Sequence, residues 1–240
     1  MDSIQVDGFV KDIKSSKKIE TWGLDYDILK NRISKTLPDN YLQLCQQIYL
    51  TYAAQKSKEP TIIGDKNNYY IQHLTELATI APKAKYLHII RDGRDVACSY
   101  KALAELHTES QYKPVLPTDV SSIAKEWVHN NNEILKFSEM ISFSNFLTIR
   151  YEDLVLHTEE TAKSMCNFFK ILYDSNMLLY YKNNQINKEE PLKTLDWKLK
   201  TLEQPDKNNI NKYRDILSMQ EIEEFNKIGE ELLLSYRYEY

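Results

Sequence analysis

The chain has 240 residues, of which 42% are hydrophobic and 28% are charged, and this composition is ordinary for one sizeable soluble domain. Its formal net charge is −4, so general binding to nucleic acid is not expected, and a polyanionic ligand would need a local basic patch. Cys45, Cys98 and Cys166 form no Cys-x-x-Cys pair, and the sequence shows neither a signal-peptide pattern nor a long apolar run. We therefore predict a cytoplasmic protein with free thiols and no membrane span.

The first third of the chain is predicted to hold two helices and one strand. Residues 1–20 contain few apolar positions and a cluster of lysines, which predicts a poorly anchored start. Apolar residues at helical spacing predict a helix over residues 38–55. Residues 61–66 are predicted to form a short apolar strand that ends in a glycine turn, and the pattern after them predicts a helix that stops at Pro82.

The middle third is predicted to hold two strands separated by helices. Residues 86–90 are of the aliphatic, aromatic and β-branched types expected in a buried strand, and a helix is predicted to follow them. After a proline-containing loop at residues 111–118, apolar residues at helical spacing predict a long helix. Residues 145–154 are predicted to be a second strand with its exit loop.

The last third is predicted to be mostly helix and loop. Thr158 and the two acids after it predict a helix start, residues 182–212 are predicted to form a loop or lid, and a capping box from Ser218 to Glu221 predicts the start of the final helix. Strand therefore alternates with helix, as parallel strands require. We predict an α/β fold with three layers, a mostly parallel central sheet and flanking helices, in one domain over residues 1–240.

Residues 86–99 have the order of a phosphate site: a buried strand, a cationic turn and a helix start. Arg91 lies at the carboxyl end of the strand, and we take Asp95 as the N-cap of the helix, which places Ser99 about one turn later. A guanidinium, a hydroxyl and a helix N-terminus would then converge on one anion. The alternative is a solvated turn whose charges pair with one another.

Charged residues also follow the ends of the other predicted strands. Lys66, Arg91 and Arg150 with Tyr151 lie where three strands end, and ligands of open parallel sheets bind at this edge. Neighbouring cations repel each other unless an anion lies between them. The alternative is a network of salt bridges in which nearby acids neutralise the cations; these acids are Asp65, Asp92 and Asp95.

These motifs resemble those of sulfotransferases that use 3'-phosphoadenosine 5'-phosphosulfate (PAPS). Arg91-Asp-Gly-Arg-Asp-Val-Ala-Cys-Ser99 resembles the segment that binds the 3'-phosphate, and Gly64-Asp-Lys66 resembles a segment of the bacterial and tyrosine-sulfating branches. Tyr151-Glu-Asp resembles the segment whose Tyr lies near the adenine. Trp197-Lys198 and Asn211-Lys-Tyr-Arg214 resemble the C-terminal basic region that covers the 3'-phosphate. The resemblance implies that Lys66 steadies the sulfuryl group and that the cofactor is bound by Arg91, Ser99, Tyr151 and Arg94.

The resemblance implies a P-loop NTPase-like sulfotransferase fold that transfers a sulfuryl group from PAPS to a hydroxyl or amine without a metal. The family's phosphosulfate-binding loop, of the Arg-Ser-Gly-Thr-Thr kind, is not found beside any of the five glycines, so we expect an N-terminally truncated form. The alternative is a noncatalytic remnant that binds nucleotide or a partner protein. A phosphotransferase like the nucleoside-monophosphate kinases is disfavoured because no Walker loop is visible.

The sequence leaves the acceptor and the general base open. A saccharide, a peptide, a lipid or a small molecule could each serve as acceptor, and self-association is expected if a missing strand and helix expose apolar surface. Asn68 stands where the cytosolic branch has a catalytic His. His73 is better explained as a structural residue. The acids nearest the position used by the tyrosine-sulfating branch are Asp7, Asp12 and Glu20.

Overall fold

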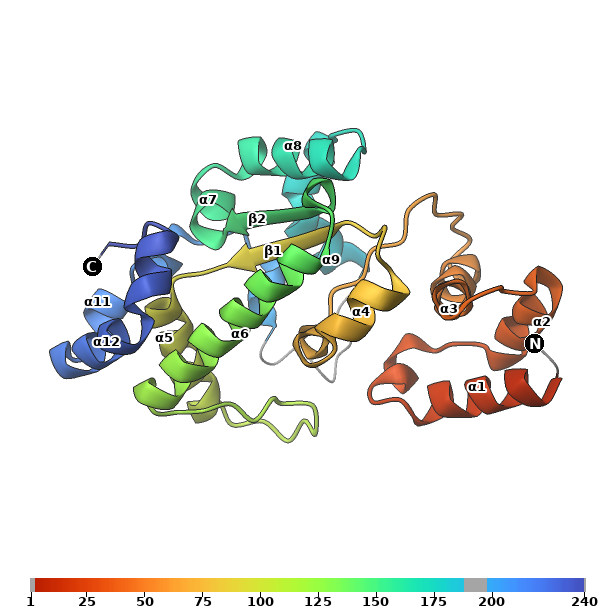
Figure 1. Ribbon diagram of the computed structural model, residues 1–240, viewed down its shortest axis with the longest axis horizontal. Coiled ribbons are helices and arrows are strands. Elements are labelled where there is room, and N and C mark those ends of the chain that lie inside the picture. Colours follow the sequence, from red (N-terminus) through yellow and green to blue (C-terminus); the bar gives the residue numbers. More distant parts are fainter. Residues whose placement is uncertain (1–2, 188–197, 240) are drawn as a thin grey trace. The chain divides into compact units, whose positions relative to one another are not determined.

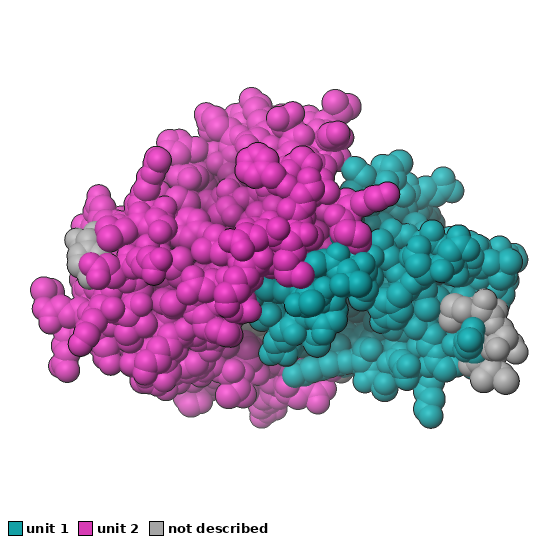
Figure 2. Space-filling view, viewed as in Figure 1, with its two compact units in different colours: residues 1–81 teal, residues 82–240 magenta. Residues whose placement is uncertain are grey.

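Two groups of helices, one of them built around a short sheet, make up the computed structural model of the chain, which describes residues 3–187 and 198–239 (Figure 1). The contacts divide it into unit 1, residues 1–81, and unit 2, residues 82–240, which are coloured separately in Figure 2. The single domain over residues 1–240 stays a prediction. None of the described helices combines the length and the apolar character needed to cross a membrane.

Unit 1 is helical and has its own apolar core. Its elements are α1 (Ser3–Ser15), η1 (Ile19–Trp22), α2 (Tyr26–Thr36), α3 (Tyr41–Gln55), η2 (Asn68–Gln72) and α4 (Leu74–Ile80). Val6 and Val10 of α1 are buried against apolar residues of α2 and α3. The prediction of a poorly anchored start is therefore wrong for α1, because two valines one helical turn apart are enough to anchor it.

Residues 61–67 of unit 1 form neither strand nor helix. The strand predicted at residues 61–66 is therefore wrong, whereas the helices predicted on either side of it are present as α3 and α4. Ile62 is 54% exposed, and neither of the described strands, β1 and β2, pairs with this segment. A short apolar run without a neighbouring strand leaves its backbone hydrogen bonds to water, which removes the main reason to adopt an extended conformation.

Unit 2 contains a parallel two-stranded sheet among helices, which confirms the α/β prediction. Strand β1 (Tyr86–Ile90) pairs with β2 (Phe146–Arg150), and the register places Ile90 opposite Arg150. The connection between the strands holds α5 (Gly93–Glu105), α6 (Val120–Met140) and η3 (Phe143–Asn145). Because the strands are parallel, their carboxyl ends meet at one edge.

The helix α6 covers one face of this sheet. The ring of Phe137 on α6 lies 4.8 Å from that of Tyr86 and 6.2 Å from that of Phe146, centroid to centroid. Figure 1 shows α6 running alongside β1. At its other end α6 packs against α12 (Met219–Ser235), where Trp127 meets Phe225. A Cβ added to Gly93 would lie 2.3 Å from Phe225 Cζ, so only glycine lets α5 begin this close to the core.

The remaining elements of unit 2 are short, apart from α8 and α12. After β2 come α7 (Tyr151–Leu156), α8 (Thr158–Phe169), η4 (Ser175–Leu179), α9 (Tyr180–Asn187), η5 (Leu199–Leu202), η6 (Lys207–Asn209) and α11 (Tyr213–Ile216). The exit loop predicted after the second strand is therefore the helix α7. The loop predicted over residues 182–212 is wrong where α9, η5 and η6 occur, while residues 188–197 lie outside the described residues. The capping box at Ser218 is confirmed.

Candidate functional site

The helix α5 begins directly after the carboxyl end of β1. Its N-cap is Asp92, whose Oδ1 accepts the Arg94 backbone N–H at 2.9 Å. The prediction that Asp95 is the N-cap is therefore wrong by three positions, because the chain enters the helix at once after Arg91. Ser99 consequently lies nearly two turns into α5, further than predicted.

The side chain of Arg94 is structural in this geometry. It is 1% exposed, and its guanidinium donates to both carboxylate oxygens of Asp92, at 2.7 and 3.0 Å. It also donates to the Asn226 side chain and to the backbone carbonyl of Glu239, and it stacks 4.1 Å from the Tyr213 ring. Because its donors are used within the protein, the predicted cofactor-binding role of Arg94 has no support here.

Arg91 and Ser99 do converge, as their spacing predicts. The guanidinium of Arg91 donates from Nη1 to Ser99 Oγ at 3.3 Å and from Nη2 to the Asn209 carbonyl at 2.6 Å. It lies 4.6 Å above the ring of Tyr151, the first residue of α7. Its buried Nε has no hydrogen-bond partner in the described chain. A buried donor without a partner in the protein can be satisfied by a bound anion.

Two lysines extend this site. Lys212 Nζ donates to Ser99 Oγ at 3.0 Å, and Lys200 Nζ donates to the Asn209 side chain at 2.9 Å. We call Arg91, Lys200 and Lys212 the cationic cluster. Burial, followed by repulsion from Arg91 and Lys200, lowers the pKa of Lys212 below its ordinary value of 10.5. The cluster is therefore a place where positive charge is unfavourable until an anion binds.

Asp95 positions the chain around Lys212 and also balances part of the positive charge of the cationic cluster. Its fully buried carboxylate accepts the backbone N–H groups of Asn211 at 2.9 Å and Tyr213 at 3.0 Å, so it fixes the residues on both sides of Lys212. Asn211 has a φ of 59°, a left-handed conformation that asparagine tolerates well. The nearest Arg91 nitrogen is 4.0 Å away. Burial raises the pKa of Asp95, and the backbone donors and Arg91 oppose this rise.

Two of the three predicted strand ends are confirmed. Arg91 follows β1 and Arg150 ends β2, and the guanidinium of Arg150 lies 4.5 Å from the ring of Tyr238. Lys66, the third, is an exposed residue in the irregular segment of unit 1. Of the C-terminal basic region, Lys212 reaches the site, whereas Trp197 lies outside the described residues.

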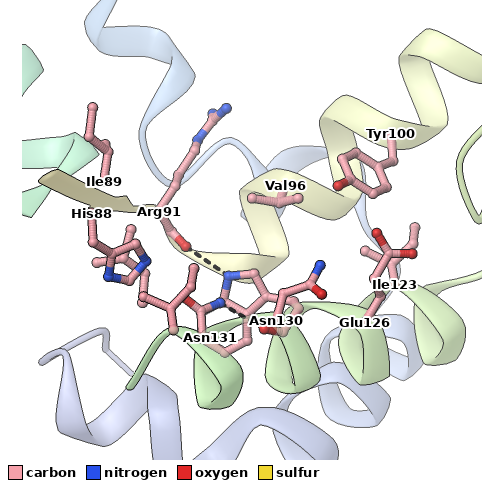
Figure 3. A pocket seen from close by; sticks show the side chains of 12 residues that line it. His88, Ile89, Arg91, Val96, Tyr100, Ile123, Glu126, Asn130 and Asn131 are labelled. Carbon is pink, nitrogen blue, oxygen red and sulfur yellow. Dashed lines mark hydrogen bonds between the residues drawn. The ribbon is translucent and has the colours of Figure 1, made fainter. Parts of the chain in front are cut away.

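A cavity of about 230 Å³ lies beside β1, α5 and α6 (Figure 3). The indole N–H of Trp127 donates to the Arg91 carbonyl at 3.1 Å in its wall, while Figure 3 shows the Arg91 guanidinium pointing away from it. Glu126 and His88 line it, and burial lowers the pKa of His88 to about 4, so this imidazole is neutral at pH 7. With a carboxylate and no cationic group directed inward, the cavity is unsuited to phosphate, whereas the charge of the cationic cluster suits an anion.

Comparison with known proteins decides the family. A model of the sulfotransferase family matches residues 9–175. The chain belongs to the sulfotransferase family. Sulfotransferase 2A6 of Rattus norvegicus is 25% identical over 192 residues, which cover 75% of this chain and 66% of the relative. Protein-tyrosine sulfotransferase 1 of Danio rerio is 25% identical over 144 residues, which cover 58% of this chain and 38% of the relative.

A solved structure of a sulfotransferase domain has the same fold as this member of the sulfotransferase family. The sulfotransferase domain from the curacin biosynthetic pathway superposes with a TM-score of 0.52 at 20% identity, over 90% of this chain and 76% of that one. The sulfotransferase fold is thereby confirmed. The 2A6 and tyrosine sulfotransferases are both 25% identical to the chain over the residues they match, so the bacterial or tyrosine-sulfating branch stays a prediction.

Proposed function

We propose that this chain binds PAPS and transfers its sulfuryl group to the hydroxyl or amine of an acceptor. Membership of the sulfotransferase family supports the reaction class. The observation that carries the proposal is the convergence of Arg91 and Lys212 on Ser99 Oγ, with the buried Arg91 Nε left without a partner among the described residues. Two cations that share one neutral oxygen would gain from exchanging it for phosphate oxygens.

The proposed 3'-phosphate site consists of the Arg91 guanidinium, the Ser99 hydroxyl and the Lys212 ammonium. Lys200, which is held through Asn209, adds charge at slightly longer range. The Arg91 guanidinium stacks on the ring of Tyr151, and we assign the side of this ring that faces away from Arg91 to the adenine. Arg94 is left out of the site because its donors are bound within the protein.

Lys66 is the proposed stabiliser of the transferring group. Sulfuryl transfer spreads negative charge over peripheral and leaving oxygens, so a mobile ammonium lowers the barrier by electrostatic attraction. Its exposure and its place in an irregular segment leave it able to meet an anion. We assign no general base and no metal to the reaction.

The three cysteines carry no disulfide, which supports the cytoplasm as the proposed compartment. The proposed acceptor is a saccharide, peptide, lipid or small molecule with a hydroxyl or amine, and nucleic acid is left out because the net charge is −4.

Titration calorimetry with two nucleotides tests the binding site. Arg91→Ala should weaken adenosine 3',5'-bisphosphate by about 10- to 100-fold, the effect of one charge-assisted hydrogen-bonded pair. The same substitution should leave the weaker binding of adenosine 5'-phosphate unchanged, since that ligand lacks the 3'-phosphate. Equal losses for both nucleotides, or no bisphosphate binding by the wild-type chain, would refute the assigned site.

A transfer assay tests the reaction. PAPS carrying a labelled sulfuryl group is incubated with the chain and with acceptors of each proposed class, and a labelled product is expected with at least one of them. Bisphosphate binding without transfer to any acceptor would instead identify a noncatalytic sulfotransferase remnant. Lys66→Ala should lower kcat while leaving bisphosphate affinity unchanged, because the two sites act on different groups of the donor.

A further inference from the structure

Asp65, the residue before Lys66, is held by two tyrosines from opposite sides in the sequence. Tyr49 on α3 donates its hydroxyl to Asp65 Oδ2 at 2.8 Å, and Tyr70 on η2 donates to the same oxygen. Asp65 lies in the irregular segment, where no ladder of backbone hydrogen bonds fixes the chain. The two phenols therefore supply the restraint that secondary structure does not supply here.

The tyrosines are themselves well supported. The ring of Tyr49 packs edge-on against Trp22, with centroids 5.7 Å apart. Tyr70 belongs to the 3-10 helix η2, whose N-cap Asn67 accepts the Tyr69 backbone N–H with its side chain at 3.0 Å. Burial and the Asp65 carboxylate raise the pKa of Tyr70 to about 12, so its phenol keeps the proton that it donates at neutral pH.

Lys66 has no comparable restraint. Its side chain is exposed, and its ammonium makes neither a hydrogen bond nor an ion pair with any described residue. Its neighbours Asp65 and Asn67 are both engaged by side-chain hydrogen bonds. The backbone is thus fixed on each side of a lysine whose charged end is free, although a carboxylate stands next to it in the sequence.

We propose that Tyr49 and Tyr70 are positioning residues that hold the Asp65 carboxylate so that the adjacent Lys66 ammonium stays free to meet an anion. Without the phenols, the Asp65 carboxylate would lose both of its hydrogen-bond donors and would be open to pairing with the Lys66 ammonium, which is one residue away in the sequence. This inference rests on the proposed function, in which Lys66 stabilises the transferring group. It adds that the aspartate of the Gly64-Asp-Lys66 segment must stay hydrogen-bonded to the two tyrosines for the lysine to act.

The rate at which Lys66 is acetylated tests this directly, because an ion-paired ammonium reacts more slowly than a free one. The full chain is treated with limiting acetic anhydride, and Lys66 modification is followed by peptide mass spectrometry. Tyr49→Phe/Tyr70→Phe should slow the reaction at Lys66 by about two- to fivefold, the range for an exposed ion pair. Adding Asp65→Asn to that variant should restore the wild-type rate, since the competing charge is removed.

Tyr69→Phe is the matched control, because its phenol is in the same 3-10 helix but contacts Lys17 and not Asp65. It should leave the Lys66 rate unchanged. An unchanged or faster rate in the double variant, or failure of Asp65→Asn to restore it, overturns the inference. If the double variant unfolds, Tyr49→Phe and Tyr70→Phe are compared singly, and each should slow Lys66 by a smaller factor.

The transfer assay separates this inference from the proposed function. In an active chain the double variant should lower kcat with the KM for PAPS unchanged, and Asp65→Asn should recover kcat. A wild-type chain that transfers nothing refutes the proposed function, whereas the acetylation result still decides whether the tyrosines keep Lys66 free. A change in the KM for PAPS without a change in kcat would overturn the positioning role.

Discussion

The carboxylate of Asp95 accepts the backbone N–H of Tyr213 at 3.0 Å, across 118 positions of the sequence. The same carboxylate accepts the N–H of Asn211. Lys212 lies between these two residues, and its ammonium is thereby brought to Ser99. A buried acid thus organises a site for an anion, through the backbone of the segment that carries one of the cations.

Asp95→Ala should weaken bisphosphate binding by roughly tenfold, although it removes a negative charge beside a site for an anion. Two backbone donors would lose their partner, and a buried donor without a partner costs about 1–3 kcal/mol. The segment around Lys212 would then leave Ser99. Calorimetry measures the effect, and Asp95→Asn should lose less, because its amide oxygen can still accept one of the two N–H groups. Tighter binding by Asp95→Ala would show that charge outweighs positioning.

The sequence predicted the part of this site that is local. Arg91 and Ser99 lie eight residues apart in one strand, turn and helix, so their convergence follows from short-range geometry. Lys212 lies 113 positions from Ser99, and only the resemblance to the C-terminal basic region pointed to it. Asp95 was assigned as an N-cap because the local pattern allows it, and its actual partners come from the distant end of the chain.

Burial of side chains and the pairing of strands explain the other differences between the predictions from the sequence and the structure. Arg94 has the same side chain as Arg91 three residues away, yet α12 and the C-terminal residues enclose it, and composition gives no sign of this. The strand expected at residues 61–66 has suitable side chains, but strand formation also requires a neighbour, which depends on tertiary structure. The helices α3, α4, α5, α6, α8 and α12 were predicted, because periodicity and capping residues act within a few positions of each other, whereas α1 and α2 were not predicted.

Gly93→Ala should destabilise unit 2 by about 1–3 kcal/mol, because its Cβ would overlap the rings of Phe225 and Trp127, at 2.3 and 2.7 Å. Urea unfolding measures the loss, and Phe225→Leu in the same chain should recover part of it by removing the closest ring atoms. Gly8→Ala is the control, since nothing lies within 4 Å of its Cβ position in α1. It should stabilise by about 0.5–1 kcal/mol. Equal effects of the two alanines would contradict the close packing at Gly93.

Stability should fall as the pH drops from about 6.5 to about 4 because of His88. Burial lowers the pKa of this imidazole to about 4, and the hydrogen bond with Asn131 opposes that shift. Between the two values the unfolded chain binds more protons than the folded chain, so acid favours unfolding, by about 3 kcal/mol once the pH is below 4. Urea unfolding across this range should show a smaller slope in His88→Gln. If His88→Gln keeps the wild-type slope, His88 is not the cause.

Binding of adenosine 3',5'-bisphosphate should take up a proton at alkaline pH through Lys212. Burial and the nearby cations lower the pKa of Lys212 in the free protein, and a bound phosphate would raise it again. Between the free and bound pKa values the complex holds more protons, so affinity falls as the pH rises through this window. Calorimetry in two buffers with different ionisation enthalpies measures the uptake.

Lys212→Arg provides the control for this proton uptake, because arginine keeps its positive charge throughout the range while reaching the same phosphate. It should bind the bisphosphate without taking up a proton, and its affinity should depend less on pH than that of the wild type. Proton release by the wild type, or the same uptake in both proteins, would assign the titration to another group.

In the absence of ligand, the same lowered pKa of Lys212 makes the folded chain bind fewer protons than the unfolded chain. This lysine therefore contributes to stability that rises as the pH approaches 10.5.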